Sequence, residues 1–194
     1  WIVDDRSDDG TIEAARALGE GPWLHLVVRD GARSLSEAVL DGLRRASHER
    51  CVVMDGDLSH PPEAIPRLLA ALDEPGVDFV IGSRYVPGGT IDAAWPFMRR
   101  VNGLLARLVA RPLVIGVHDP NSGFFALRRS RFLAATDLNP IGYKVGLELL
   151  IKCGCRSVRE VPIHFHERLY GRTKLGWRQR LQFLEHVRRL WWYR

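Results

Sequence analysis

Short apolar runs alternate with helix-like segments, and this alternation restricts the fold of the chain more than any other feature. Residues 51–54 form an unbroken apolar run, which is typical of a strand covered by helices on both faces of a parallel sheet. Two further strand candidates, at the mostly apolar residues 24–28 and 77–81, are separated from it by segments with helical periodicity. Strands and helices in this alternation predict an α/β domain with a mainly parallel central sheet.

Capping residues and prolines mark where the helices begin. Residues 34–37 read S-L-S-E, which matches a capping box and predicts a helix to about residue 46. The Pro61-Pro62 pair stands where the start of a helix tolerates proline. Further helices are predicted at residues 11–18, 97–110, 143–153 and 177–193, and further strands at residues 1–3, 124–127 and 158–165.

Length and composition fit one folded domain. Of the 194 residues, 46% are hydrophobic and 26% are charged, which excludes a disordered chain. No linker divides the sequence, so we expect a main domain at residues 1–176 and a basic amphipathic helix at residues 177–194. Because the chain opens on an apolar run without a leading strand or a Met, we expect that the N-terminal strand of the domain is missing.

Positive charge is concentrated at the C-terminal end. The formal net charge is +5, and residues 168–194 hold eight Lys or Arg residues against one acid, Glu185. Trp177, Leu181 and Leu184 recur at helical spacing, which predicts a helix that lies on an anionic membrane surface or leads into a membrane-spanning segment. A helix packed on the domain, with its arginines in solvent, is the alternative. Nucleic acid is excluded as a partner because no nucleic-acid-binding motif is recognised.

The three cysteines, Cys51, Cys153 and Cys155, are an odd number without a C-x-x-C pair. This pattern argues against a disulfide framework and against a zinc site, so we expect structural thiols in a reducing, cytosolic setting. No apolar run approaches the ~20 residues that cross a bilayer, which predicts a soluble or peripheral protein.

Two pairs of acidic residues follow predicted strands. Asp55 and Asp57 flank Gly56 directly after a buried strand, and ligands collect at the carboxyl ends of strands in open α/β sheets. Two carboxylates beside a glycine fit a divalent cation and a diphosphate, although D-G-D alone is also an ordinary turn. Asp4 and Asp5 follow the first strand, which predicts four carboxylates on one edge of the sheet. Such a cluster needs a cation or donor groups to offset its repulsion.

Four other polar side chains have two interpretations each. His60 is either a third metal ligand or, as we favour, a residue of the helix entry. His164 and His166 alternate along a strand, so they share one face, where a structural role is favoured over a metal site. Glu148 lies on an apolar helix and faces either the core or the site.

Five segments of the chain resemble the family 2 inverting glycosyltransferases, and within them the dolichol- or polyprenyl-phosphate mannose synthases. The segments are IVDDRSDDGT from residue 2, MDGDLSHPPE from 54, GSRYVPGG from 82, DPNSGFFALRR from 119 and EVPIHFHERLYGRTKLG from 160. They occur in the order of the family and cover nearly the whole chain. The resemblance implies the fold of a nucleotide-diphospho-sugar transferase of the A type.

The resemblance also implies roles for individual residues. Asp5 matches a position near the nucleobase or ribose of the donor, and Asp4 beside it is a further candidate for binding the donor. Asp55 and Asp57 match the ligands of Mg²⁺ or Mn²⁺, while Ser59 stands where many relatives have glutamine. Ser122 lines the substrate site or belongs to a plain turn. The residues that match phosphate-contacting positions are Arg84, Arg99, Arg168 and Lys174.

By the same resemblance the chain transfers mannose from GDP-mannose to a polyprenyl phosphate such as dolichyl phosphate, with inversion. Two alternatives stay open: a UDP-glucose donor, and a non-catalytic module that binds a sugar nucleotide. A phosphate monoester has a second pKa of about 6, so the acceptor needs no strong general base at neutral pH. The expected location is the cytoplasmic face of a membrane, with a membrane-spanning partner or fused segment as a further possibility.

Overall fold

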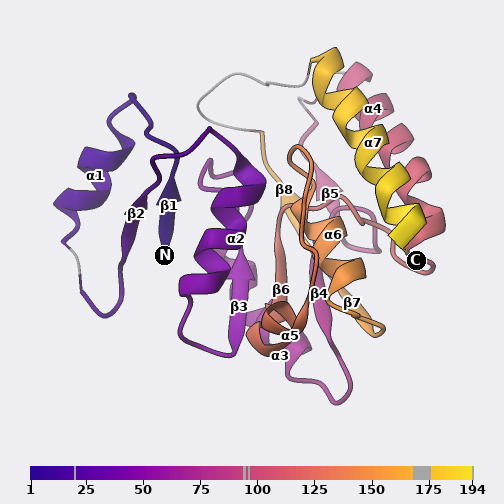
Figure 1. Cartoon of the computed structure of the whole chain (residues 1–194). Coiled ribbons are helices and arrows are strands. Elements are labelled where there is room, and N and C mark those ends of the chain that lie inside the picture. Colours follow the sequence, from indigo (N-terminus) through magenta and orange to yellow (C-terminus); the bar gives the residue numbers. More distant parts are fainter. Residues whose placement is uncertain (20, 94, 96, 168–175, 194) are drawn as a thin grey trace.

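The computed structural model describes the whole chain except residues 20, 94, 96, 168–175 and 194 (Figure 1). The strands are β1 (Ile2–Asp4), β2 (Leu26–Val28), β3 (Arg50–Val53), β4 (Phe79–Ser83), β5 (Thr90–Ile91), β6 (Phe125–Arg128), β7 (Val158–Pro162) and β8 (His164–Phe165). The α-helices are α1 (Thr11–Ala17), α2 (Leu35–Arg45), α3 (Ile65–Leu72), α4 (Phe97–Ala110), α5 (Arg129–Ala134), α6 (Val145–Lys152) and α7 (Trp177–Tyr193). Short 3₁₀ helices, η1 (Pro62–Ala64) and η2 (Arg111–Leu113), precede α3 and follow α4.

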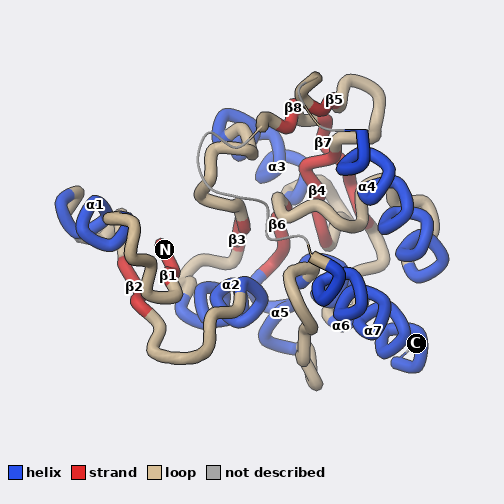
Figure 2. The backbone as a smooth tube through the Cα atoms, turned by 90° about the horizontal axis from the view of Figure 1, so that it is seen from above, coloured by secondary structure: helices blue, strands red, loops and turns tan. Residues whose placement is uncertain are grey.

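A four-stranded sheet in the order β3-β6-β4-β7 forms the centre of the molecule (Figures 1 and 2). Strand β4 pairs with β7 in parallel, and the pairs β1-β2 and β5-β8 are parallel as well. Strand β6 runs antiparallel to both of its neighbours. The predicted α/β fold with a mainly parallel sheet is therefore confirmed, with β6 as an antiparallel strand in its middle.

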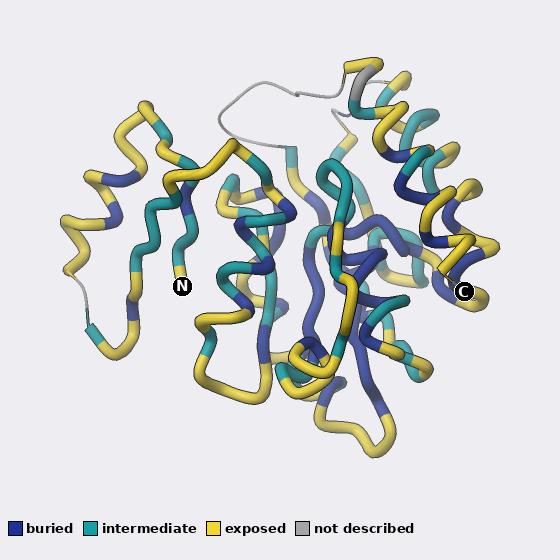
Figure 3. The backbone as a smooth tube through the Cα atoms, viewed as in Figure 1, coloured by how far each residue is buried: buried dark blue, intermediate teal, exposed yellow. Residues whose placement is uncertain are grey.

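Residues of the central strands alternate between two hydrophobic cores, one on each face of the sheet. Phe79 and Ile81 of β4 face the larger core, which also contains apolar residues of α2, α6 and α7. Val80 faces the smaller core, which is built on α3. Because successive side chains of a strand point to opposite faces, the unbroken apolar runs of the sequence fill both cores. Figure 3 shows the resulting buried centre.

The N-terminal strands form a two-stranded sheet of their own, which packs on α2. A Cβ atom on Gly42 of α2 would lie 3.2 Å from Cγ2 of Val3, so the helix and β1 are in close contact. The Ser34 hydroxyl caps α2 by accepting from the N–H of Glu37, as predicted. The expectation of four carboxylates on one edge of one sheet was wrong, because β1 pairs with β2 while β3 pairs with β6.

Helix α7 packs one side on the domain and exposes the other. Phe183, Val187 and Leu190 are buried in the larger core, whereas Trp177, Leu181 and other large apolar side chains of α7 are exposed. The buried side fits a helix packed on the domain, and the exposed apolar side fits a helix that lies on a membrane surface. None of the helices described by the structure is long and apolar enough to cross a membrane.

Candidate functional site

The Asp55-Gly56-Asp57 segment lies at the carboxyl end of β3, separated from the strand by Met54. The side chain of Asp55 is 32% exposed. One carboxylate oxygen of Asp57 accepts hydrogen bonds from the Ser59 N–H at 3.1 Å and the Ser59 hydroxyl at 2.5 Å. Ser59 is buried, and its two hydrogen bonds to Asp57 stabilise the turn from the interior side. The Asp57 carboxylate itself stays partly exposed to solvent.

His60 is buried between the rings of Phe124 and Phe165 and supports the same turn. Its Nδ1 accepts from the backbone N–H of Asp55 at 3.4 Å. Burial, followed by the charge of Arg84, lowers the pKa of His60 to about 4. Because the Nδ1 lone pair accepts from the backbone and the ring is packed between two phenylalanines, the structure favours the helix-entry interpretation over a metal ligand.

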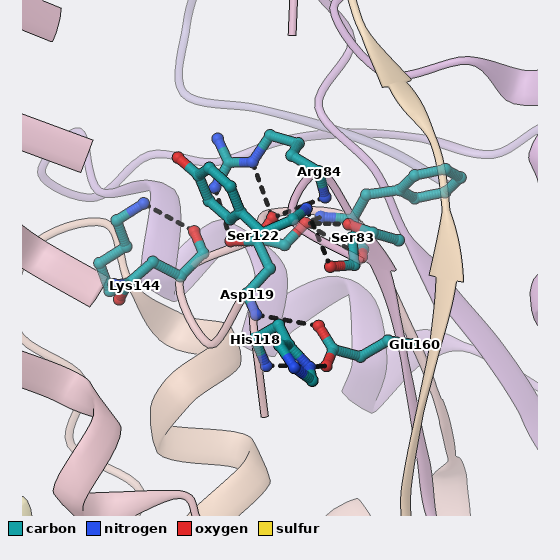
Figure 4. Close-up of polar contacts among 11 residues, drawn as sticks. Ser83, Arg84, His118, Asp119, Ser122, Lys144 and Glu160 are labelled. Carbon is teal, nitrogen blue, oxygen red and sulfur yellow. Dashed lines mark hydrogen bonds and ion pairs between the residues drawn. The ribbon is translucent and has the colours of Figure 1, made fainter. Parts of the chain in front are cut away.

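Arg84 directly follows β4 and is clamped by Asp119 from the loop before β6 (Figure 4). Its Nε and Nη2 each donate to one oxygen of the Asp119 carboxylate at 2.7 Å, and its backbone N–H donates at 3.0 Å. Asp119 is in turn held by Glu160 of β7, which accepts from the Asp119 N–H at 2.9 Å and the His118 N–H at 2.7 Å. The guanidinium group of Arg84 is therefore fixed in orientation by Asp119, whose own position is held by Glu160 of β7.

The loop at residues 119–123 connects this clamp with the acidic segment. A Cβ atom on Gly123 would lie 3.2 Å from a carboxylate oxygen of Asp55, so a larger residue here would require the Asp55 side chain to shift by a few tenths of an ångström. The buried Ser122 hydroxyl donates to the Gly82 carbonyl at 2.8 Å and accepts from the Phe124 N–H at 3.2 Å. These bonds favour the turn interpretation of Ser122.

Three other predicted site residues have different partners or lie outside the described part. Arg99 of α4 lies 3.9 Å above the ring of Trp95 and 3.5 Å from a Glu167 oxygen. Arg168 and Lys174 fall outside the described residues, so the structure does not place them.

Asp4 and Asp5 have partners of their own near the N-terminal sheet. Asp5 accepts from Arg29 at 2.5 Å and from the Ser34 N–H at 2.6 Å, and Asp4 accepts from the Ser7 N–H. The repulsion predicted among the acidic residues is thus offset locally at this pair.

Glu148 faces the interior between α6 and α7. Its carboxylate accepts from the Asn139 N–H, pairs with Lys152 at 3.0 Å and bonds His186 at 2.7 Å. Because its oxygens bond these groups within the fold, Glu148 has a structural role.

His164 and His166 share one face, with ring centroids 4.4 Å apart, as predicted. All three cysteines are free thiols.

The donor set at Asp55 and Asp57 suits a hard divalent cation. Two partly exposed carboxylates lie on one short turn, and the described residues contain no group of three or more His, Cys, Asp or Glu side chains placed to hold a metal. Mg²⁺ in phosphate-handling sites commonly takes one or two carboxylates and completes its coordination with substrate phosphates and water. The residues present therefore fit such an ion.

Three neighbours of the candidate site were not singled out from the sequence: Asp119, Glu160 and Lys144. Asp119 and Glu160 begin two of the five family-like segments, so a signal for them existed. Lys144 lies outside those segments, and a lysine at the start of a helix normally indicates a solvated residue.

The model of glycosyl transferase family 2 matches residues 1–133 of the chain, which is more than half of its length. The chain belongs to this family. It is 42% identical to a dolichol-phosphate mannosyltransferase of Mycosarcoma maydis, over 100% of this chain and 66% of the relative. It is 41% identical to a dolichol-phosphate mannosyltransferase of Pyrococcus furiosus, over 97% of this chain and 54% of that relative. The chain thus spans between about half and two thirds of the length of these two relatives.

A solved structure shares the fold of the chain. Glucosyl-3-phosphoglycerate synthase from Mycobacterium tuberculosis, in complex with Mn²⁺, UDP-glucose and phosphoglyceric acid, superposes with a TM-score of 0.69 at 22% sequence identity. The match covers 98% of this chain and 66% of that structure. The predicted nucleotide-sugar transferase fold is confirmed.

Proposed function

We propose that the chain transfers mannose from GDP-mannose to a polyprenyl phosphate such as dolichyl phosphate, with inversion at the anomeric carbon. The observation that carries this proposal is the match of nearly the whole chain, at 42% and 41% identity, to two dolichol-phosphate mannosyltransferases. The acidic segment after β3 and the fixed Arg84 supply the groups that such a transfer needs.

In this reaction an oxygen of the lipid phosphate attacks the anomeric carbon of mannose. The bond from that carbon to the β-phosphate oxygen breaks, and its electron pair leaves with GDP. Attack from the face opposite to the leaving group gives inversion. The acceptor phosphate is largely dianionic at neutral pH, so the buried position of Glu148 is consistent with a mechanism that has no strong base.

The residues of this chain bind and orient the two anionic substrates. Asp55 and Asp57 would hold Mg²⁺ or Mn²⁺, which as a Lewis acid stabilises the negative charge of the departing diphosphate. Mn²⁺ and a nucleoside diphosphate sugar are also named for the solved structure that shares this fold. Arg84 offsets the repulsion between the two phosphates, and its clamp on Asp119 keeps its donors in a fixed direction.

Further substrate contacts belong to the same proposal. In this proposal Asp4 and Asp5 lie near the nucleobase or ribose of the donor. Ser122 stabilises the loop at residues 119–123 through its hydrogen bond to the Gly82 carbonyl. Three additional basic residues contact phosphate in this proposal: Arg99, Arg168 and Lys174.

The acceptor lipid requires a membrane, and the proposed docking surface lies on α4 and α7. Both helices stand at the same end of the molecule (Figures 1 and 2). Large exposed apolar side chains on them are Phe97, Met98, Leu104, Leu105, Leu108, Trp177, Leu181, Leu184, Trp191 and Trp192. Basic residues such as Arg100 and Arg188 lie on the same helices, which suits an anionic surface. The proposed location of the chain is the cytoplasmic face of the membrane, either alone or together with a membrane-spanning partner or fused segment.

Incubation of the chain with each labelled donor, Mn²⁺ and a short polyprenyl phosphate tests the proposal. We expect a lipid-linked mannose product from GDP-mannose and little product from UDP-glucose. A product from UDP-glucose alone would replace the donor and keep the reaction class. Binding of a sugar nucleotide without any transfer would leave the non-catalytic module as the better account.

A further inference from the structure

Lys144 is a cation of the candidate site that the proposed function does not yet use. It stands at the N-cap of α6, and its Nζ donates to the Asn121 carbonyl at 2.7 Å (Figure 4). Asn121 belongs to the loop that carries Asp119 of the Arg84 clamp and Gly123 beside Asp55. Lys144 is therefore tied to the loop that connects the cationic and acidic parts of the site.

The electrostatic surroundings of Lys144 are those of the site itself. The residue keeps part of its surface in solvent, but burial of its ammonium group, followed by the charge of Arg84, lowers its pKa to about 8. Asp119 and Asp55 act in the opposite direction. Within the described part of the chain, Lys144 forms no ion pair with a carboxylate, whereas Lys152 on the same helix pairs with Glu148. Besides the Asn121 carbonyl, the Lys144 Nζ faces the ring of Tyr143, 4.8 Å from the ring centroid. A largely desolvated cation whose neighbours are a carbonyl and a ring, but no carboxylate, is stabilised further when an anion binds beside it.

The side chain of Asn121 supplies a second, independent observation. Asn121 is only 6% exposed, and both its Oδ1 and its Nδ2 are buried without a hydrogen-bond partner among the described residues. Buried amides in native proteins are nearly always satisfied, so this one requires a hydrogen-bond partner from outside the described residues, such as a water molecule or a group of the substrate. The unsatisfied amide and the ammonium group without a carboxylate partner belong to two residues in direct contact.

We infer that Lys144 and the Asn121 amide form a subsite for a phosphate group of the substrate, next to the Asp55-Gly56-Asp57 turn. The ammonium group and the amide N–H donate to phosphate oxygens. The phosphate belongs either to the diphosphate of the donor or to the monophosphate of the acceptor. Both groups present anionic oxygens that accept hydrogen bonds. This inference rests on the proposed function, which supplies the phosphate-bearing substrates.

Calorimetric titration of the chain in Mn²⁺ with inorganic pyrophosphate, and separately with hexyl phosphate, tests the subsite. Lys144→Met and Asn121→Leu are expected to weaken one of the two ligands about 10-fold or more, as for the loss of a charge-assisted hydrogen bond. Loss with pyrophosphate assigns the donor diphosphate, and loss with hexyl phosphate assigns the acceptor. Lys144→Arg retains the charge and should restore most of the affinity. Lys152→Met removes the other described lysine of α6 and should leave both affinities unchanged.

Thermal unfolding separates the subsite from a structural role. Replacing a buried unpaired cation with methionine should leave the melting temperature of Lys144→Met equal to or above that of the unmodified chain. Affinities of Lys144→Met and Asn121→Leu within twofold of the unmodified chain, for both ligands, would overturn the inference. Because binding is measured without turnover, a failure of mannose transfer and a failure of this subsite are distinguishable.

Discussion

Arg84 and Asp119 form a two-point ion pair in which each carboxylate oxygen accepts one guanidinium N–H at 2.7 Å. Their side chains are only 13% and 1% exposed. The pair joins the end of β4 to the loop that reaches Asp55, so it orders the candidate site as well as the fold. Removal of one partner would leave a buried charge without compensation.

Asp119→Asn is expected to lower the free energy of unfolding by about 3 kcal/mol, since Arg84 would keep its charge without its carboxylate. Urea denaturation of the unmodified and variant chains measures the loss. Asp73→Asn is the control, because Asp73 pairs with Arg50 at the surface and such pairs contribute about 1 kcal/mol or less. Equal losses in the two variants would show that the clamp does not stabilise the fold.

Glu148 makes stability depend on acid pH. Burial alone would raise its pKa, but hydrogen bonds from His186, Asn139 and Lys152 outweigh burial and hold the pKa below its ordinary value of 4.5. A carboxyl group with a lower pKa in the folded state stabilises the fold above pH 4.5, and this contribution is lost as the pH falls through the folded-state pKa.

Thermal unfolding between pH 7 and pH 3 checks this dependence. Glu148→Gln should be less stable at pH 7 and should lose less stability than the unmodified chain below pH 4.5. Glu13→Gln, at an exposed position of α1, should follow the unmodified chain. Parallel curves for Glu148→Gln and the unmodified chain would contradict the assignment.

Gly82 of β4 leaves no room for a side chain. A Cβ atom there would lie 2.7 Å from Cδ1 of Phe124, a ring that is fully buried. Gly82→Ala should therefore cost about 1–3 kcal/mol of unfolding free energy, as overpacking of a core does. Gly31→Ala, whose Cβ would meet its nearest neighbour at 3.8 Å, should stay within about 0.5 kcal/mol. Urea denaturation midpoints of the two variants measure this difference. Equal midpoints would show that the core near Phe124 rearranges to accommodate the added methyl group.

Trp191 and Trp192 should anchor the chain on anionic vesicles. Both rings are exposed on α7, so their replacement by Ala in one double variant is expected to reduce cosedimentation with vesicles about 10-fold or more. Higher salt should weaken binding too, because it screens the arginines of the helix. Trp23→Ala removes an equally exposed ring from the loop before β2 and should have no effect. Equal losses in the two variants would locate the membrane contact elsewhere.

Local patterns predicted the helices well because their signals lie within a few residues. Helices α4 and α7 occupy the predicted residues 97–110 and 177–193, and Ser34 caps α2 as expected. The place of β6 was not predicted, since pairing with β3 and β4 depends on contacts far apart in the sequence.

The candidate site was predictable where a motif carried it and not elsewhere. Asp55, Asp57 and Arg84 were predicted from the family-like segments that contain them. In the structure the loop at residues 119–123 contacts Arg84 at one end and Asp55 at the other. The partner of Arg84 could not be read from the pattern, because Asp119 lies 35 positions away. Lys144 gave no signal, since its surroundings come from Asn121, Asp55 and Arg84, which only the fold assembles.

The most direct test of the account is the rate at which mannose passes from GDP-mannose to a short polyprenyl phosphate, compared between Asp57→Asn and Asp73→Asn in the presence of Mn²⁺. Loss of several kcal/mol of transition-state stabilisation predicts that Asp57→Asn is about 100-fold slower or more, while Asp73→Asn keeps the full rate and chelation of the metal abolishes it. Equal rates for the two variants, or transfer that survives chelation, would contradict a metal-assisted transfer at the acidic segment after β3.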